Sequence, residues 1–405
     1  MRGSVGAPPG RDRIGAGPVA PRRRSYAPAF AGATILVLIA GIGIWLYTRA
    51  PAPPVLPPPA AGPPAQVLAR LARGVNLSNW LQHGPATEAA RYAPDAADWR
   101  LIRRLGLTHV RLPVDPAALL DARGLPQAEA LAELRAAVEG AADEDLLVVL
   151  AMQLPSELKP GLAAREPDRA ALAGTWRWLA GALRDLPPAQ LAFEPLNEPG
   201  VADALAGRAL MEYLTAALRA AAPLHTLVVA GHGYSGIEEL EALRPLADPN
   251  LVYSFHFYEP HNFTHQGASW GDPAWRLLRN FPYPSSPESV AARRGAAPPK
   301  ARELLRWHGE QRWNRERVGA LLERAARWGR NNRVPVQCSE FGVLKKRVAA
   351  ADRAAWLRDV REALEARGIG WTHWDYAGEF GIVGGKQGKR VGDKKAIEAL
   401  GLKKP

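Results

Sequence analysis

The chain has 405 residues, of which 47% are hydrophobic, and its formal net charge is +12. This apolar fraction excludes a wholly disordered protein, and the length allows two or three average domains or one large barrel. The single cysteine excludes a disulfide framework and a cysteine-based zinc cluster.

The positive charge is concentrated at the two ends of the sequence. Residues 1–49 hold seven arginines against one aspartate, and residues 385–405 hold seven lysines and arginines against two acidic residues. The long segment between them is almost neutral. This distribution argues against a nucleic-acid-binding domain, whose folded body would carry a basic surface. We expect the basic C-terminal residues to form a solvated surface.

An uncharged apolar segment near the N-terminus predicts a membrane anchor. Residues 30–47 read FAGATILVLIAGIGIWLY, close to the roughly 20 residues that cross a bilayer. Three arginines at 22–24 precede it, so we expect residues 1–29 to be a basic cytoplasmic tail. We assign residues 30–48 to a single-pass helix in the inner (plasma) membrane and place the rest in the periplasm or outside the cell. The alternative is a cleaved signal peptide.

A proline-rich stretch follows the predicted anchor. Residues 51–64 contain eight prolines in fourteen positions, a composition that favours an extended, semi-rigid chain. We assign residues 49–67 to this linker. Residues 68–405 then form the folded domain.

Short apolar runs alternate with stretches of helical periodicity from residue 68 onward. Eight such strand-then-helix units predict a closed (β/α)₈ TIM barrel of the α/β class, with a doubly wound open sheet as the alternative. The predicted strands are residues 73–78, 109–114, 146–152, 191–197, 226–231, 251–258, 335–341 and 370–376. The predicted helices lie near residues 96–105, 127–142, 168–185, 204–222, 236–244, 313–331, 350–367 and 394–400.

The connection after the sixth predicted strand is unusually long. It runs over residues 259–312 and is rich in aromatic, proline and polar residues. Loops of this length are usually functional, and the loops after barrel strands form the face that carries the active site. We therefore expect this connection to form a lid or a wall of the site.

Polar and aromatic side chains end most of the predicted strands. Two of them are carboxylates, Glu198 after the fourth strand and Glu340 on the seventh. Two carboxylates that flank a bond are what glycoside hydrolysis requires. The candidate substrate-binding residues around them are Arg111, Gln153, Asn197, His256, Tyr258, Trp270 and Trp374.

Six ordered segments carry a family resemblance. They are RGVNLSNW (73–80), VRLP (110–113), LNEP (196–199), FHFY (255–258), FTHQGASW (263–270) and SEFG (339–342). Over about residues 70–385 the chain resembles glycoside hydrolase family 5, the cellulase family of the clan-A barrels. The resemblance implies that Glu198 is the general acid/base and Glu340 the nucleophile of a retaining double displacement. The pKa of Glu198 should then be raised and Glu340 should be ionised.

The resemblance also implies roles for the surrounding residues. Asn197 would bind the sugar 2-hydroxyl, His256 and Tyr258 would orient the carboxylates, and Arg111 would support Glu340. Trp374 would form the sugar platform in the −1 subsite, and Trp270 could stack a neighbouring sugar. Gln153 departs from the family, which usually has a histidine at this position, and its amide can donate to a hydroxyl without carrying charge.

These residues predict a retaining hydrolase of β-linked polysaccharide, which we expect to be an endo-β-1,4-glucanase without cofactor or metal. The alternatives are a β-mannanase or exo-β-1,3-glucanase of the same family, or a non-hydrolytic polysaccharide-binding barrel in an envelope assembly. We expect Glu194 to form a structural ion pair with an arginine and Cys338 to pack as a small apolar residue. Packing roles are also expected for Trp99, Trp176, Trp178, Trp328 and Trp356.

Overall fold

The computed structural model describes residues 62–82, 93–295 and 297–404, and the predicted anchor at residues 30–48 lies outside these ranges. Among the helices in the described ranges, none has both the length and the apolar character needed to cross a membrane.

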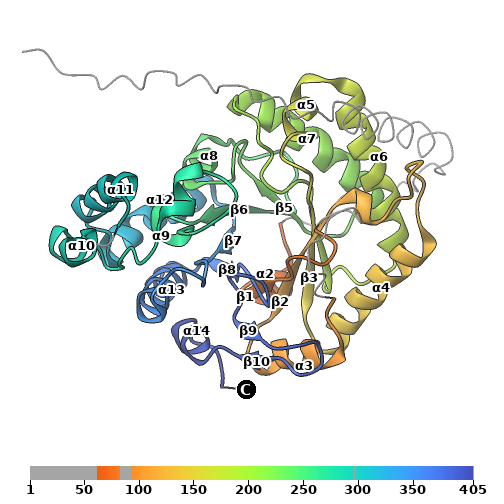
Figure 1. Cartoon of the computed structure of the whole chain (residues 1–405). Helices are drawn as coiled ribbons and strands as arrows, with labels where there is room; N and C mark the ends of the chain where they lie inside the picture. Colours follow the sequence, from red (N-terminus) through yellow and green to blue (C-terminus); the bar gives the residue numbers. More distant parts are fainter. Residues whose placement is uncertain (1–61, 83–92, 296, 405) are drawn as a thin grey trace, which may run out of the picture.

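Eight parallel strands close into a barrel in chain order (Figure 1). They are β1 (Arg73–Asn76), β2 (His109–Val114), β3 (Leu147–Met152), β4 (Leu191–Glu194), β5 (Leu227–Ala230), β6 (Leu251–Phe257), β7 (Val336–Phe341) and β8 (Gly370–His373). Pairing of β1 with β8, in which Gly74 lies opposite Thr372, closes the ring. The predicted (β/α)₈ barrel is therefore confirmed, and the open-sheet alternative is wrong.

The strands of the barrel are buried on both faces, and their sequences explain why. Every residue of β2, β3, β5 and β6 is buried, since one side of each strand faces the barrel interior and the other faces the surrounding helices. Strands of this kind are continuous apolar runs, as in LVVLAM of β3, rather than alternating patterns.

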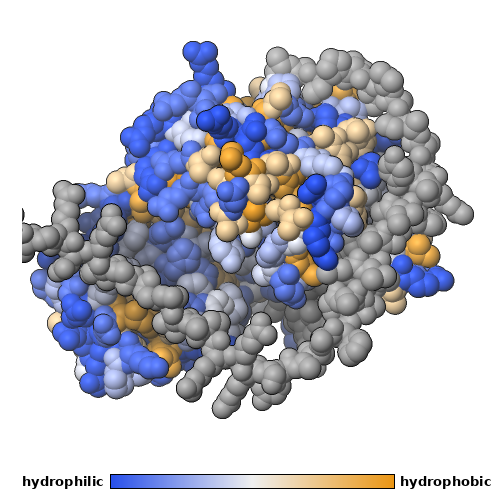
Figure 2. Space-filling view, turned by 90° about the horizontal axis from the view of Figure 1, so that it is seen from above, coloured by the Kyte–Doolittle hydropathy of each residue, from blue (hydrophilic) through white to orange (hydrophobic). Residues whose placement is uncertain are grey.

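The eight predicted helices form a ring around the barrel (Figure 1). They are α3 (Ala96–Arg104), α4 (Ala128–Asp143), α6 (Glu166–Leu183), α7 (Ala204–Ala221), α8 (Ile237–Ala242), α12 (Arg315–Asn332), α13 (Ala350–Glu365) and α14 (Lys394–Ala399). Of the five tryptophans expected to pack, Trp178 is partly buried and the other four are buried. On the side of the molecule shown in Figure 2, hydrophobic residues are interspersed among hydrophilic ones.

A short helix, α2 (Ala65–Arg70), covers the amino-terminal end of the barrel. Its Val67 packs with Leu71 in a cluster that includes Leu147, the first residue of β3. Thr108, just before β2, donates a hydrogen bond of 2.6 Å to the Arg70 carbonyl. Because Val67 is fully buried, the folded body includes the end of the range predicted as linker.

The long connection after β6 is largely helical. It contains α9 (His261–Thr264), the 3₁₀ helix η2 (Pro273–Leu277), α10 (Pro287–Arg294) and α11 (Pro299–Glu310). Figure 1 shows α10 and α11 together at the side of the barrel, near α12. Only its first part reaches the candidate site, as described below.

The basic C-terminal segment is only partly solvated. It contributes strand β10 (Val391–Gly392), which pairs in a small hairpin with β9 (Val383–Gly384) just before the segment. Arg390 departs from the expected solvated surface, because its buried guanidinium forms an ion pair with Asp98 and lies 5.4 Å from the Tyr376 ring centroid. The free Cys338 is fully buried in the core, as expected.

Candidate active site

A cavity of about 440 Å³ lies at the carboxyl-terminal end of the barrel strands. Seven of the nine predicted site residues line it, and the other two, Arg111 and His256, are buried. The seven are Gln153, Asn197, Glu198, Tyr258, Trp270, Glu340 and Trp374. The cavity volume is in the range of small-molecule sites.

Glu198 lies in a sharp turn between β4 and α7. Its φ angle is 44° and that of Gly200 is 67°. Backbone hydrogen bonds hold the turn from both sides: Asn197 N–H donates to the Met152 carbonyl over 2.8 Å, and Gly200 N–H donates to the Gly233 carbonyl over 3.0 Å. A positive φ is uncommon outside glycine and persists where the surroundings enforce it. These contacts fix the direction of the Glu198 side chain.

A β-bulge positions Glu340. Phe255 of β6 pairs with Cys338 of β7, but the next residue of β6, His256, pairs with Glu340. Ser339 is therefore the extra residue of the bulge. Since a bulge changes which side chains face each other across two strands, it brings Glu340 beside His256.

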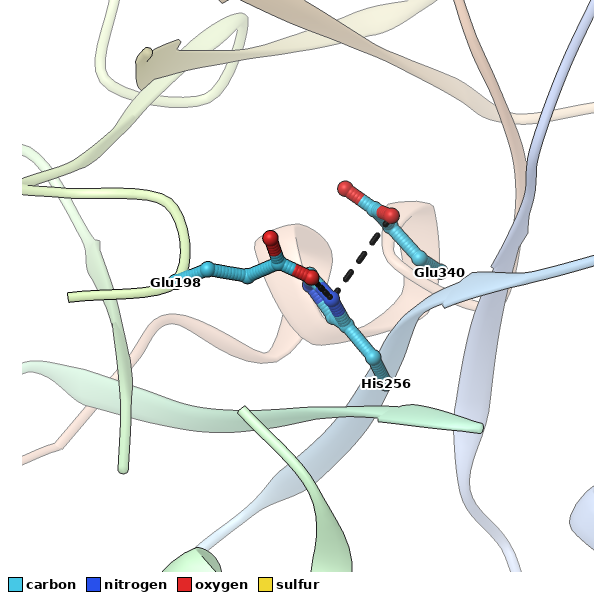
Figure 3. Close-up of side chains that lie close together, drawn as sticks. All are labelled: Glu198, His256 and Glu340. Atoms are coloured by element: carbon cyan, nitrogen blue, oxygen red, sulfur yellow. Dashed lines mark hydrogen bonds and ion pairs between the residues drawn. The ribbon is translucent and has the colours of Figure 1, made fainter. Parts of the chain in front are cut away.

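His256 lies between the two carboxylates (Figure 3). Its Nδ1 is 3.1 Å from Oε1 of Glu198 and 3.6 Å from Oε2 of Glu340. An oxygen of each carboxylate and a ring nitrogen of His256 all lie within 4.8 Å of one another. In geometry this set could also hold a metal ion, but hydrogen bonds within the protein already engage Nδ1 of His256, Oε1 of Glu198 and both oxygens of Glu340. The short separation fits two carboxyl groups that act on the same bond.

Arg111 connects the carboxylates at the bottom of the site. Its guanidinium donates to Oε1 of Glu340 over 2.8 Å, to Glu194 over 2.6 and 2.7 Å, and to Oδ1 of Asn197 over 2.7 Å. It also donates to Oδ1 of Asn76 over 2.9 Å. Glu194 is thus the structural ion-pair partner that the sequence predicted. Arg111 thereby holds Glu340, Glu194 and Asn197 in fixed positions at the bottom of the site.

Tyr258 supports the same carboxylate from β6. Its hydroxyl donates to Oε2 of Glu340 over 2.9 Å. Burial, together with the charge of Glu340, raises the pKa of Tyr258 well above its usual value, so the phenol keeps its proton. Both oxygens of Glu340 therefore accept a hydrogen bond, one from Arg111 and one from Tyr258.

The ionisation of Glu198 differs from the prediction. Burial alone would raise its pKa, but the hydrogen bond from His256 and the charges of His256, Lys159 and Arg111 outweigh burial and lower it. Burial likewise opposes the charged form of His256, and the two glutamates raise its pKa nevertheless. The raised pKa expected for Glu198 is therefore wrong for the free protein. The two shifts together favour a protonated His256, whose Nδ1 lies 3.1 Å from Glu198.

Aromatic and amide side chains form the walls of the cavity. Trp374 follows β8, and Gln153 follows β3. Trp270, from the long connection, is 45% exposed, and its ring centroid lies 6.4 Å from that of Phe380. The oxygen of Asn197 accepts from Arg111, so the amide N–H₂ is the group that Asn197 can offer to a ligand.

Six further residues line the cavity and were not among the predicted site residues: Asn79, Gln82, His265, Asp375, Glu379 and Phe380. Asn79 and Asp375 follow β1 and β8, so the strand-end argument could have found them. Burial raises the pKa of Asp375 to about 6 and lowers the pKa of His265 to about 3. Glu379 lies in a loop with no pattern that marks it.

Comparisons with known proteins agree with this architecture. The family model described as "Cellulase (glycosyl hydrolase family 5)" matches residues 72–379. Endoglucanase 3 of Fibrobacter succinogenes is 27% identical over 334 residues, which cover 77% of this chain and 50% of that protein. Endoglucanase C of Acetivibrio thermocellus is 27% identical over 316 residues, which cover 75% of this chain and 90% of that protein. The chain thus spans about half the length of the first relative.

Solved structures with the same fold include two from other bacteria. The Clostridioides difficile protein described as cellulose synthase subunit Z superposes with a TM-score of 0.67 and 24% identity, covering 81% of this chain and 99% of that one. The endoglucanase Cel5A of Thermotoga maritima superposes with a TM-score of 0.67 and 23% identity, covering 82% and 99%. At this level of identity, these likenesses show the fold.

Proposed function

Because this chain belongs to glycosyl hydrolase family 5 and is therefore a glycoside hydrolase, we propose that it is a retaining endo-β-1,4-glucanase. The observation that carries the proposal is the short distance between Glu198 and Glu340. One carboxylate oxygen of each glutamate lies within 4.8 Å of the other and of a ring nitrogen of His256. Retaining enzymes hold their two carboxyl groups about 5–5.5 Å apart, whereas inverting enzymes leave space for a water molecule between them. The names of the two curated relatives, both endoglucanases, support β-glucan as substrate.

In the first step, Glu340 attacks the anomeric carbon and forms a glycosyl ester, while the glycosidic bond breaks. The leaving oxygen takes a proton from Glu198. Nδ1 of His256 lies 3.1 Å from Oε1 of Glu198, so a proton can pass along this hydrogen bond to Glu198 when substrate binds. In the second step, Glu198 removes a proton from water, which attacks the anomeric carbon and releases Glu340.

The remaining predicted residues bind and orient the sugar. Asn197 donates to the 2-hydroxyl with its free amide N–H₂, and Trp374 offers a flat face to the same ring. Trp270 stacks a neighbouring sugar. Gln153 donates to a hydroxyl at the position where the family resemblance implies a histidine, and its amide carries no charge.

We further propose that the enzyme is held at the inner membrane by residues 30–48 and acts in the periplasm or outside the cell. The uncharged segment and the arginines that precede it support this location. The proline-rich stretch would hold the barrel away from the bilayer surface.

The proposal is tested by reducing-sugar release from β-1,4-glucan by the full-length protein in detergent. Glu198→Gln and Glu340→Ala should each remove most activity, while Glu303→Gln on the exposed side of α11 should keep it. Release of reducing sugar from β-mannan or β-1,3-glucan, but not from β-1,4-glucan, would show that the enzyme has one of the alternative specificities. Binding of a glycan without release of any product would leave the polysaccharide-binding alternative.

A further inference from the structure

Lys159 is a buried lysine next to the candidate active site. It is the first residue of α5 (Lys159–Ala164), in the connection that follows β3, and it is only 3% exposed. Lysine is rarely buried to this extent unless an acidic group pairs with it. It is not among the residues that line the cavity. Its position therefore needs a reason other than contact with substrate.

The stem of Lys159 lies against the turn that carries Glu198. A Cβ atom added to Gly200 would lie 3.3 Å from Cβ of Lys159 and 3.5 Å from its Cδ. Gly200 has a φ of 67°, a conformation that glycine adopts without strain. Lys159 thus packs on the bare backbone two residues after Glu198, and a larger residue at 200 would displace it.

The ammonium of Lys159 has no direct partner among the residues that the structure describes: it makes neither a hydrogen bond nor an ion pair within 4.0 Å. The charge that acts on it most strongly is nevertheless that of Glu198. Burial lowers the pKa of Lys159, and the carboxylate of Glu198 opposes this effect more than that of Glu340 does. In turn, Lys159 is one of the charges that lower the pKa of Glu198.

We propose that Lys159 is a positioning residue, whose stem supports the Glu198 turn and whose charge acts on the protonation of Glu198. The proposal rests on the proposed role of Glu198 as acid/base. Besides His256, Lys159 is then a second positive group that acts on Glu198. It lies on α5, which precedes β4 in the chain, and outside the six segments that carry the family resemblance.

The other charged groups named here around Glu198 and Lys159 are held in ion pairs or, in the case of Asp203, in a helix cap. His256 from β6 pairs with Glu198, and Arg111 from β2 pairs with Glu340 from β7 and with Glu194 from β4. Two helices pack on α5: Asp168 of α6 pairs with Arg165, and Asp203 caps the start of α7. Lys159 differs from these groups because its charge is not tied to one partner, so its removal should leave the other ion pairs intact.

The sign of the effect follows from the acid role. Glu198 must be protonated to protonate the leaving oxygen, and a nearby positive charge favours its ionised form. Removal of the charge should therefore let Glu198 keep its proton at higher pH. The fall of activity on the alkaline side should move to higher pH.

The experiment compares Lys159→Met, which removes the charge, with Lys159→Arg, which keeps it, in the full-length protein. For Lys159→Met, the ratio of kcat/KM at pH 8 to that at pH 6, measured on a soluble cello-oligosaccharide, should rise about threefold or more. Lys159→Arg should keep the wild-type ratio. Lys345→Met is the matched control, because Lys345 is partly buried and the carboxylates that act on it are Asp375, Asp393 and Glu379 rather than Glu198.

A second readout does not depend on turnover. Carbon-13 NMR of glutamate carboxyl groups follows the titration of Glu198, whose signal is the one lost in Glu198→Gln. Its midpoint should move to higher pH in Lys159→Met and stay in place in Lys159→Arg. Thermal melting checks that each variant is folded, and Lys159→Gln replaces Lys159→Met if the latter does not fold.

The outcomes separate the two proposals. A wild-type protein that hydrolyses no glycan overturns the proposed function, and the NMR titration still decides the role of Lys159. If the wild type is active but Lys159→Met loses rate with no change in pH dependence, Lys159 only packs the turn and the inference is wrong. An equal shift in Lys159→Met and Lys159→Arg would overturn it as well.

Discussion

Arg111 and Glu194 form a bidentate ion pair, with N–O distances of 2.6 and 2.7 Å, and neither side chain is more than 1% exposed. The pair fixes two of the three guanidinium nitrogens of Arg111. The third nitrogen, Nη1, is thereby directed at Glu340, 2.8 Å away. Glu194 does not line the cavity, yet it determines how Arg111 meets the candidate nucleophile.

Glu194→Gln should therefore impair both stability and catalysis. The amide keeps the shape of the carboxylate but leaves the buried guanidinium with less negative charge around it. Breaking a buried ion pair from one side costs about 3–5 kcal/mol. We expect urea unfolding to show a loss of free energy of unfolding near the lower end of this range. We also expect a fall in kcat under conditions where the variant is folded. An unchanged free energy of unfolding would contradict the structural role of this pair.

Glu340→Ala should lower kcat by about 10³-fold or more, because the glycosyl ester can no longer form. The variant also leaves space beside the anomeric carbon. Azide should enter it and restore part of the activity on a substrate with a good leaving group. The product should be an α-glycosyl azide, identified by NMR, because a single displacement inverts the configuration. Formation of the β-azide would exclude Glu340 as nucleophile.

Tyr258→Phe should reduce kcat/KM by about 10- to 100-fold, the range expected for one hydrogen bond to a charged group. The ring and its packing remain, so the melting temperature should change little. Arg111 still donates to the other oxygen of Glu340, which explains why the loss should be partial. A variant as inactive as Glu340→Ala would assign Tyr258 a direct part in the reaction.

Asp375→Asn should stabilise the protein at high pH. Burial raises the pKa of Asp375 to about 6 from its ordinary value of 3.8, so the fold favours the protonated form. This contribution is complete below about pH 4 and is lost as the pH rises through 6. At pH 8 the asparagine variant should be more stable by about 2–3 kcal/mol, and the difference should vanish near pH 4. Denaturant unfolding at both pH values checks this, and a constant difference would refute it.

The positions of the site residues could be predicted because the barrel brings strand ends together. Glu198 and Trp374 are far apart in sequence, yet both follow strands, and both line one cavity. The bulge at Ser339 could not be read from the sequence, since VQCSEF has no alternation that marks an extra residue. The ionisation of Glu198 was also missed, because it depends on the distance to His256.

The prediction of a loop for the long connection after β6 rests on its length and its content of aromatic, proline and polar residues. Two of its prolines, Pro287 and Pro299, are the first residues of α10 and α11. Proline fits the first turn of a helix, where its missing N–H has no partner to lose. Proline therefore occurs both in loops and at the first position of helices. Only the residues that follow the proline show whether a helix begins there.

The helix α2 lies at the end of the barrel opposite to the cavity: Arg70 donates to the carbonyl of Ala189, before β4, whereas Gln153 and Trp374 follow their strands. The chain that precedes Ala65 is therefore joined to the base of the barrel. A bead or chip coupled through that part of the chain would present the mouth of the cavity outward. Immobilised in this way, the protein could meet a long insoluble fibre without steric interference from its own attachment point.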